Sequence, residues 1–294
     1  MKAAARLTAG PPPLRLRRRS AQRQTPFFGR HRHKVGGGVR VYAVGDIHGR
    51  LDLLTRMLDQ IDEDRRYHGV DDARLVFLGD YIDRGPHSAD VLELLSGGNF
   101  EGFTTTCLLG NHEGAFVDYL EGRGDGIDWL TYGGIATAAS YGVAVPPSAD
   151  IIDMAEAVRP LLRKAVPPEH RHFLKCLPLS HAIDDYLFVH AGLLPGLPLD
   201  RQDPLDLLTI REPFLTSEVD HGRMVVHGHT MVDEPEIQKN RIAIDTGAFA
   251  TGRLTCLVLD GGEKRFLVAD AGRKAVVSDN GMDQGRDSLR YGFS

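Results

Sequence analysis

Five short apolar segments, each followed by a glycine turn and a side chain that can bind a metal ion, constrain this chain most strongly. The apolar segments are rich in β-branched and aromatic residues, which predicts buried strands; they span residues 39–44, 73–78, 104–109, 186–189 and 223–227. Glycine lets the chain turn after a strand without a Cβ clash, so side chains from several strand ends can converge. The sequence therefore predicts a polar centre at the ends of a group of strands.

The polar residues after these strands are carboxylates, amides and imidazoles, with no thiolate among them. They occur in the motifs Gly45-Asp46-Ile47-His48-Gly49, Gly79-Asp80-Tyr81-Ile82-Asp83-Arg84-Gly85, Gly110-Asn111-His112-Glu113, His190-Ala191-Gly192 and Gly228-His229-Thr230. Such ligands suit manganese, iron or magnesium better than a structural zinc site. Two ions roughly 3.5 to 4 Å apart can hold a phosphoryl group and lower the pKa of a shared water to near neutrality. The motifs therefore predict a two-metal centre that hydrolyses phosphate esters.

From about Val39 to Asp260, these motifs resemble those of the phosphoprotein phosphatase (PPP) family of metallophosphoesterases, in particular its bacterial and phage serine/threonine phosphatases. The resemblance implies an α/β (α+β mixed) fold of the calcineurin-like type, with two facing mixed β-sheets flanked by helices and a helical cap insertion. It also implies two divalent metal ions per chain, Mn²⁺ first, with Fe, Zn or Mg as alternatives. The implied ligands are Asp46 and His48 for the first metal, Asp80 as a bridge, and Asn111, His190 and His229 for the second.

The same resemblance implies roles for residues beside the metals. His112 is the implied general acid, and Asp83 orients it. Leu109 stands where many family members carry an arginine, so one phosphate contact is missing or comes from another residue. The implied phosphate-binding residues are Arg84, Asn111 and, in the segment 210–214, Arg211.

Simpler roles stay open for some of these residues. Arg84 can be a surface ion-pair residue, and Arg211 can cap a helix or pair with Glu212. His227, just before the Gly228-His229 motif, is expected to pack or to support a ligand rather than to bind a metal. The remaining histidines are interpreted as ordinary polar residues.

The favoured function is a metal-dependent phosphomonoester hydrolase that removes phosphate from phosphoserine or phosphothreonine in proteins, by direct attack of a hydroxide bound to two metals. One alternative is a dinucleoside polyphosphate hydrolase acting on diadenosine tetraphosphate, and another is a broader phosphatase that also accepts phosphotyrosine. Symmetrical dinucleoside tetraphosphate hydrolases usually lack an acid at the position of Asp83 and carry Asp in place of Glu113, so both positions favour the protein phosphatase. A catalytically inactive phosphate-binding scaffold is disfavoured, because every implied ligand and His112 are present.

Composition divides the chain into three parts. Residues 1–38 are a basic leader, rich in proline and glycine and expected to be disordered; residues 39–275 are the catalytic domain, and residues 276–294 are a polar tail. A helical cap is expected at about 114–180, with helices at 115–122, 127–141 and 155–177. Its aromatic residues Trp129, Tyr132 and Tyr141 either line the substrate cleft or pack the cap onto the core.

Local patterns predict the remaining elements. Leu53, Leu54, Met57, Leu58 and Ile61 recur at helical spacing, and Ser88 is predicted to be the N-cap of a helix over 89–95. After the cap, residues 241–245, 254–259 and 265–269 are predicted to be successive antiparallel strands. A chain of 294 residues with 42% hydrophobic content can bury one large core of this kind.

Charge is distributed unevenly between the leader and the rest of the chain. Eleven of the 35 basic residues fall within residues 1–40, which contain no acid, so 24 basic residues face 40 acidic ones in the remainder. The leader is interpreted as a solvated tail or the product of a start codon placed too early, with an anionic-surface or nucleic-acid tether and an organelle transit peptide as alternatives. The catalytic body is expected to bind no nucleic acid; its expected partner is a phosphoprotein or phosphopeptide.

Cysteine content and hydropathy indicate the compartment. Cys107, Cys176 and Cys256 are odd in number and lie in apolar runs, which favours buried free thiols in a reducing compartment over a disulfide framework. The sequence has no apolar stretch near the ~20 residues that span a bilayer. These features predict a cytoplasmic protein without a membrane segment, and they leave the oligomeric state open.

Overall fold

The computed structural model describes residues 33–98, 100–145 and 150–272. The predicted tail and residues 1–32 of the predicted leader therefore lie outside the described residues. Residues 33–38, which the prediction also included in the leader, pack on the domain. Val35 is buried and its N–H donates to the Gly261 carbonyl over 3.0 Å, and the Gly36 N–H donates to Asp184 Oδ2 over 2.7 Å.

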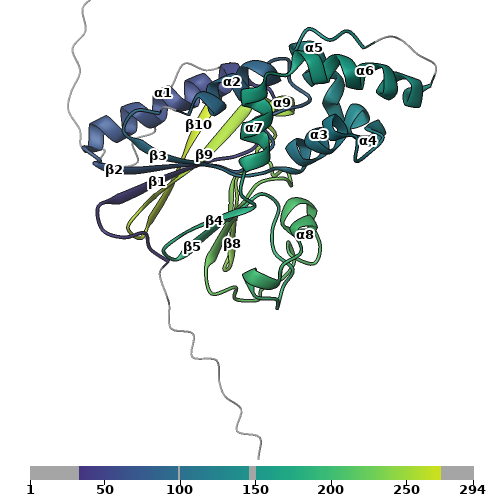
Figure 1. Ribbon diagram of the computed structural model, residues 1–294. Coiled ribbons are helices and arrows are strands. Elements are labelled where there is room, and N and C mark those ends of the chain that lie inside the picture. The colour runs from purple at the N-terminus through teal and green to yellow at the C-terminus, as the bar shows by residue number, and fades with distance from the viewer. Residues whose placement is uncertain (1–32, 99, 146–149, 273–294) are drawn as a thin grey trace, which may run out of the picture. The chain divides into compact units, whose positions relative to one another are not determined.

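In the part of the chain that the structure describes, ten strands form two mixed five-stranded sheets (Figure 1). The first sheet has the order β10-β9-β1-β2-β3, in which β1, β2 and β3 are parallel and β9 is antiparallel to both β1 and β10. Its strands are β1 (Val39–Val44), β2 (Asp72–Phe77), β3 (Phe103–Cys107), β9 (Arg253–Asp260) and β10 (Glu263–Asp270).

The second sheet has the order β4-β5-β6-β8-β7. Strands β5, β6 and β8 are parallel, while β4 and β7 are antiparallel edge strands. Its strands are β4 (Ser180–Ile183), β5 (Tyr186–Val189), β6 (Met224–His227), β7 (Glu236–Ile237) and β8 (Arg241–Ala243). The expectation of two facing mixed sheets is confirmed.

Alternation along each strand explains how the sheets pack, because successive side chains of a strand point to opposite faces. In β1, Val41 and Ala43 join a core that also contains Phe188 and Val226 of the second sheet, so this core lies between the sheets. Side chains Tyr42 and Val44 instead join the core beneath the helices. Since both of their faces are covered, the inner strands β1 and β2 are largely apolar, whereas the edge strand β3 carries three threonines.

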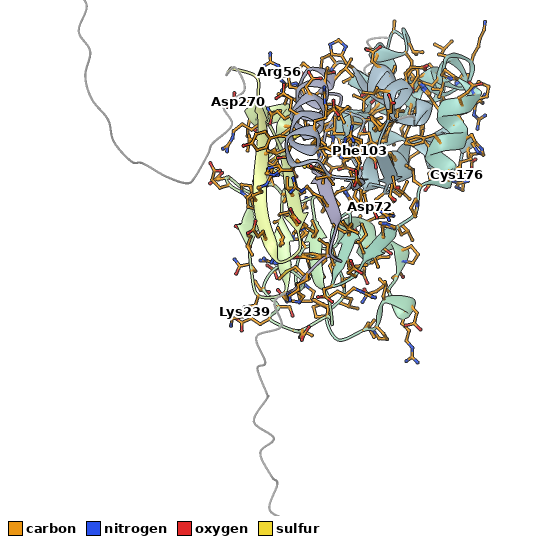
Figure 2. All side chains as sticks on the ribbon, turned by 90° about the vertical axis from the view of Figure 1, so that its left-hand side faces the viewer. Arg56, Asp72, Phe103, Cys176, Lys239 and Asp270 are labelled. Carbon is orange, nitrogen blue, oxygen red and sulfur yellow. The ribbon has the colours of Figure 1, made fainter. Side chains whose placement is uncertain are left out.

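Helices cover the outer face of the first sheet (Figure 1). Helix α1 (Leu51–His68) buries the predicted apolar stripe and ends at Gly69, whose φ of 60° supplies the left-handed cap. Arg56 of α1 donates from Nη1 to the Asp270 carbonyl at the end of β10 over 2.9 Å (Figure 2). Helix α2 (Ser88–Gly97) lies beside it, and the short α9 (Ala248–Thr251) precedes β9.

The segment between β3 and β4 is helical, as its composition suggests. It contains α3 (Asn111–Glu121), α4 (Ile127–Trp129), the π-helical turn η1 (Leu130–Gly134), α5 (Ile135–Ser140), α6 (Ile151–Ala165) and α7 (Pro168–Cys176). On the second sheet, η2 (Leu199–Arg201) and α8 (Pro204–Thr209) follow β5, and Leu207 of α8 packs on Val189 and Val225. Within the described residues, no helix combines the length and apolar character needed to cross a membrane.

Two local predictions are wrong. The three strands that were predicted to be successive and antiparallel belong to two different sheets. The first of them, β8, pairs in parallel with β6. Of the three, β9 and β10 are the two that pair antiparallel with each other. Ser88 is the first residue of α2 and its side chain does not cap the helix; its Oγ instead accepts from the Asp83 N–H over 3.0 Å. A hydrogen bond to the loop five residues earlier takes the place of the helix cap there.

Candidate functional site

The five motifs meet at one edge of the two sheets. Strands β1, β2 and β3 are parallel, and so are β5 and β6, so their carboxyl ends lie on the same side and the following loops converge. Five non-glycine residues of these motifs have left-handed backbones, among them His48 with a φ of 47°, Asp80 with 52° and His229 with 61°. Non-glycine residues rarely adopt this conformation, and its strain is typical of functional sites. A Cβ on Gly110 would lie 2.3 Å from the Asp80 amide nitrogen, so this approach requires glycine.

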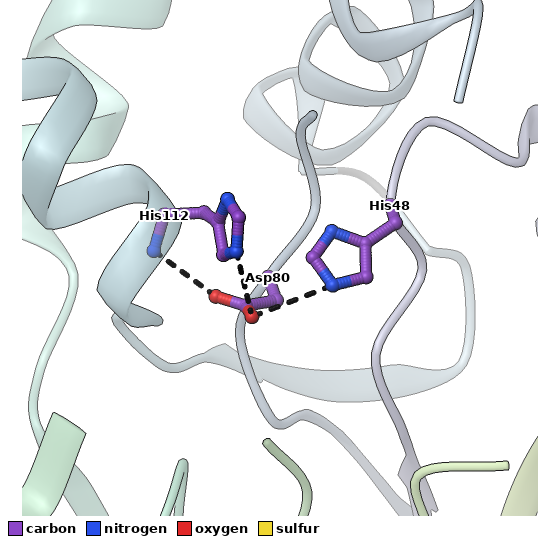
Figure 3. Close-up of side chains that lie close together, drawn as sticks. All are labelled: His48, Asp80 and His112. Carbon is purple, nitrogen blue, oxygen red and sulfur yellow. Dashed lines mark hydrogen bonds and ion pairs between the residues drawn. The ribbon is translucent and has the colours of Figure 1, made fainter. Parts of the chain in front are cut away.

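Asp80 lies at the centre of the site. Its Oδ2 lies 3.5 Å from His48 Nε2 and 3.9 Å from His112 Nε2, and its Oδ1 accepts from the His112 N–H over 3.2 Å (Figure 3). Oδ1 also lies 3.4 Å from His190 Nε2. Burial alone would raise the pKa of this carboxyl, but the surrounding imidazoles hold it below its usual range. An ionised carboxylate shared by several imidazoles fits a bridging ligand.

Asn111, at the start of α3, contacts a second group of potential ligands, His190 and His229. Its Oδ1 lies 2.9 Å from both His190 Nε2 and His229 Nδ1. The His229 N–H in turn donates to Asp46 Oδ2 over 3.0 Å, which links this group to the loop after β1. Every predicted metal ligand is thus part of one contiguous cluster.

The donor set fits divalent cations. The side chains of His48, Asp80 and His112 form one set of potential ligands, and those of Asp80, His190 and His229 form another, so the two sets share Asp80. Asp46 Oδ1 is buried and has no hydrogen-bond partner among the described residues. Burial, together with Asp245 and Asp80 close by, raises the pKa of Asp46 well above its usual value. A cation at this point would relieve the crowding of buried carboxylates.

Backbone carbonyls fix the imidazole rings of His48 and His190 in an orientation suited to metal binding. The carbonyl of Ile82 lies 2.8 Å from His48 Nδ1 and that of Leu78 lies 2.9 Å from His190 Nδ1, so Nε2 of both rings faces the centre. Burial lowers the pKa of His48 to about 3, with His112 and Arg84 adding to the effect against Asp80. A neutral imidazole with an oriented ring is the form that binds metal.

His112 forms a different pair with Asp83. Its Nδ1 lies 2.6 Å from Asp83 Oδ2, and the Asp83 side chain is fully buried. Burial lowers the pKa of His112, but the Asp80 and Asp83 carboxylates outweigh it and raise the pKa to about 9. This ring can therefore carry a proton at neutral pH, unlike the other imidazoles of the site.

The guanidinium of Arg84 lies close to both His48 and His112. Its Nη1 lies 2.9 Å from His48 Nε2 and its Nη2 lies 3.1 Å from His112 Nε2. The guanidinium lies 4.6 Å from the ring centre of Phe249, which also contacts the His48 ring edge-on at 5.3 Å. The planar fork is thus held over the site by an aromatic face, a geometry suited to a phosphate ligand.

The sequence matches a known protein family. Residues 39–241 match the family model described as Calcineurin-like phosphoesterase. The chain belongs to this family. The phosphoesterase is 29% identical over 223 residues to serine/threonine-protein phosphatase 2 of Escherichia coli, covering 73% of this chain and 90% of the relative. It is 30% identical over 225 residues to the asymmetrical bis(5'-nucleosyl)-tetraphosphatase PrpE of Bacillus mycoides, covering 73% and 88%.

Solved structures agree on the fold. A cold-active protein tyrosine phosphatase aligns with a TM-score of 0.51 at 19% identity, covering 80% of this chain and 81% of that one. The predicted PPP family and calcineurin-like fold are therefore confirmed, and the phosphoesterase is a hydrolase of the metal-dependent type. The names of these relatives include phosphatases of proteins and a hydrolase of dinucleoside tetraphosphates, so family membership is compatible with either class of substrate.

Two residues of the phosphoesterase have roles that sequence reasoning missed. Glu113 is fully buried and accepts the backbone N–H groups of Gly110, Asp80, Tyr81 and Ile82 over 2.8 to 3.2 Å, so it anchors the loop after β2. Burial and Asp80 raise the pKa of Glu113 to about 8, against these donors and His112. Its position at the third residue of α3 was a usable signal, because an acid there reaches back to the helix start.

Asp245 is the second missed residue. It is buried after β8, accepts the Gly247 N–H over 2.8 Å and lies against Asp46. Burial raises the pKa of Asp245 to about 6 and Asp80 adds to this, while the Gly247 N–H opposes it. The sequence pattern of a strand followed by Asp245-Thr246-Gly247 repeats that of the other motifs, and could have identified it.

Other candidates lie farther from the centre. Arg211 is exposed, and its positive charge adds to the burial that lowers the pKa of His229, which places it at the rim. His227 is fully buried and packs 5.1 Å from the Phe214 ring, as predicted for a packing residue. Trp129 stacks on Phe116 at 4.9 Å, which supports packing rather than cleft lining.

The remaining two cap aromatics differ from each other. Tyr141 stacks on Phe116 at 6.4 Å, and its hydroxyl lies 2.7 Å from His170 Nδ1, so it too is a packing residue. Tyr132 is 64% exposed, so its side chain does not pack the cap. All three cysteines are free, as predicted, but the expectation that they are buried holds only for Cys256, because Cys107 is half-buried and Cys176 is exposed.

Proposed function

We propose that this phosphoesterase removes phosphate from phosphoserine and phosphothreonine in proteins. The observation that carries the proposal is the buried His112–Asp83 pair, 2.6 Å apart and next to Asp80. The alkoxide of serine is a poor leaving group, so its departure requires a positioned acid. His112, with a pKa raised to about 9, meets that requirement.

In this proposal the metal-binding residues form two sets, which share Asp80. Asp46 and His48 would hold one divalent ion, Asn111, His190 and His229 would hold the other, and Asp80 would be shared by both. Two such ions, when bound, orient the phosphoryl group and activate a water for in-line attack. Mn²⁺ is the first candidate, with Fe, Zn and Mg as alternatives, because the donors are oxygen and nitrogen atoms only.

The other residues handle the substrate. Arg84, held between Phe249 and two imidazoles, binds the phosphate oxygens with its planar fork. Arg211 at the rim adds a second positive charge, and Asn111 contributes from the start of α3. Asp83 holds the His112 ring so that Nε2 faces the leaving group.

A second candidate function is hydrolysis of dinucleoside tetraphosphates. The relative from Bacillus mycoides carries that name and matches as well as the phosphatase from Escherichia coli. The leaving group in that reaction is a nucleotide phosphate, which departs without strong acid assistance. The buried acid pair therefore favours the alkyl phosphate of phosphoserine, and the aryl phosphate of phosphotyrosine comes between the two.

The proposed compartment is the cytoplasm, and the proposed partner is a phosphoprotein or phosphopeptide. Cys107, Cys176 and Cys256 are free, and Cys176 is exposed, which fits a reducing environment. We propose no nucleic-acid partner for the catalytic body.

The test compares substrates on one preparation. The protein loaded with Mn²⁺ is assayed for kcat/KM on a phosphoserine peptide, on the same peptide with phosphotyrosine, and on diadenosine tetraphosphate. The proposal expects the phosphoserine peptide to be hydrolysed with the largest kcat/KM. A larger value for diadenosine tetraphosphate would overturn it in favour of the second candidate.

A further inference from the structure

The carboxylate of Asp83 has two oxygens, and each has its own partner. Oδ2 lies 2.6 Å from His112 Nδ1, and Oδ1 accepts from Thr137 Oγ1 over 2.6 Å. All three side chains are buried, and those of Asp83 and Thr137 have no exposed surface. Thr137 belongs to α5 in the segment between β3 and β4, 54 residues beyond Asp83 in the chain.

The hydroxyl of Thr137 makes two hydrogen bonds with Asp83. Besides donating to the carboxylate, Oγ1 accepts the Asp83 backbone N–H over 2.9 Å. Ser88 Oγ, 2.9 Å from Thr137 Oγ1, competes for the single hydroxyl proton. The bond to the Asp83 carboxylate is the shorter of the two, at 2.6 Å against 2.9 Å, so we assign the proton to Asp83.

The backbone of Asp83 needs such support. Asp83 and Arg84 are consecutive non-glycine residues with left-handed φ values of 72° and 69°. Such conformations persist only where surrounding contacts fix them. The same helical segment fixes the second residue as well, because the Arg84 N–H donates to the Gly133 carbonyl over 3.2 Å.

We propose that Thr137 is a positioning residue for the general acid, the third member of a Thr137–Asp83–His112 chain. By pinning Oδ1, Thr137 fixes the rotation of the Asp83 carboxylate, so that Oδ2 points at Nδ1 and the imidazole presents Nε2 to the leaving group. Among the described residues, the side chain of Asp83 has hydrogen bonds to these two partners alone. The inference rests on the proposed function of His112 as the acid.

The central test removes the hydroxyl and keeps the shape. Thr137→Val is compared with Thr137→Ser, which restores a hydroxyl, and with Thr131→Val as a matched control. Thr131 lies in the same segment, is exposed and donates only to the Ile127 carbonyl. Each variant, loaded with Mn²⁺, is assayed on a phosphoserine peptide and on p-nitrophenyl phosphate, and its metal content is measured.

Thr137→Val should lower kcat on the phosphoserine peptide by about 10-fold to 100-fold, part of the ~10² to 10⁴ that a positioned acid contributes. The aryl phosphate has a better leaving group, so its kcat should fall far less, and KM and metal content should stay unchanged. Thr137→Ser should recover most of the loss, and Thr131→Val should match the wild type. If Thr137→Val does not fold, Thr137→Ala removes the same hydroxyl without placing a new methyl group there.

A double variant separates this inference from the proposed function. In a His112→Asn background, Thr137→Val should cause no further selective loss, because it acts through His112. If His112→Asn is selective for the phosphoserine peptide but Thr137→Val slows both substrates equally or neither, Thr137 has only a packing role and the inference is overturned. An unselective loss in His112→Asn alone would overturn the proposed acid, and this inference with it.

Discussion

The site has two halves that are built differently. In the strand-end half, residues such as Asp46, Asp80 and His190 come one to three positions after parallel strands, so the hydrogen-bonded registers of the two sheets place them. In the cap-facing half, Asp83, Arg84 and the N–H groups around them depend on contacts from a helical segment about 50 residues away. Strand pairing fixes the positions of the residues in the first half, and packing of the helical cap fixes those in the second.

This difference matches the chemistry that we propose for each half. Metal ligands must be held at short, fixed distances, which rigid strand ends provide. The acid and the phosphate-binding arginine must fit a substrate that enters and leaves. Damage to the strand-end half should therefore abolish all activity, whereas damage to the cap-facing half should lower the rate with the metals still bound, and should depend on the substrate where it affects the acid.

The largest effect is expected at Asp80. Asp80→Asn removes the charge that the imidazoles of His48 and His190 surround, so both metal sites should weaken together. Activity on every substrate should fall below detection at trace metal, and elemental analysis should find well under the wild-type metal content. Chelation of the wild type should give the same loss, and added Mn²⁺ should reverse it. Full activity in metal-free protein would contradict the two-metal proposal.

The strand-end half could be predicted from sequence because its signals are local. An apolar run predicts a strand, and the glycine and polar residues after it predict a converging loop, so Asp46, Asn111 and His229 could be named without the fold. The pairing of the strands could not be predicted in this way. The run at β8 reads like those at β9 and β10, and only the packing of apolar faces sends it to the other sheet.

The second effect, smaller and selective, is expected at His112. His112→Asn should lower kcat on a phosphoserine peptide by about 10² to 10⁴ and that on p-nitrophenyl phosphate far less, because only the alkoxide needs a proton on departure. Metal content should stay unchanged if His112 is the acid. Since its Nε2 also lies within reach of the proposed ligands His48 and Asp80, equal losses on both substrates together with lost metal would show that His112 is a ligand.

The third effect concerns the phosphate itself. Arg84→Ala removes a fork that lies over His48 and His112, so kcat/KM should fall by about 10² on peptide and aryl substrates alike. Arg84→Lys should recover only part of the loss, because an ammonium keeps the charge but not the fork. Arg211→Ala, at the rim, is the comparison and should cost less. Equal losses at the two arginines would contradict their different placement.

The cap-facing half shows where sequence reasoning stops. Thr137 and Phe249 carry no local signal, since a threonine in a helix and a phenylalanine after a strand are common. Their meaning comes from Asp83 at 2.6 Å and the Arg84 guanidinium at 4.6 Å, distances that only the packed chain defines. Ser88 makes the same point, because its local pattern predicts a helix cap, while the nearby Asp83 N–H takes its oxygen instead.

The smallest effect is expected on stability rather than on rate, at His227 behind the strand-end half. Burial lowers the pKa of His227 to about 4, with Arg241 adding to the effect against the Gly228 carbonyl. An unfolded imidazole has a pKa of about 6.5, so the unfolded state takes up this proton first as the pH falls. The stability contributed above pH 6.5 is therefore lost as the pH falls towards 4.

His227→Gln should remove that dependence. Between pH 7 and pH 5, the free energy of unfolding of the metal-free wild type should fall by about 2 kcal/mol more than that of the variant. Urea unfolding at both pH values measures this difference, and the neighbouring carboxyls cancel because both proteins contain them. Since His227 packs on Phe214 and lies outside the ligand cluster, the variant should keep its metal at pH 7. Parallel pH profiles would show that burial of this ring does not hold it neutral, and loss of metal would mean that the strand-end half extends to His227.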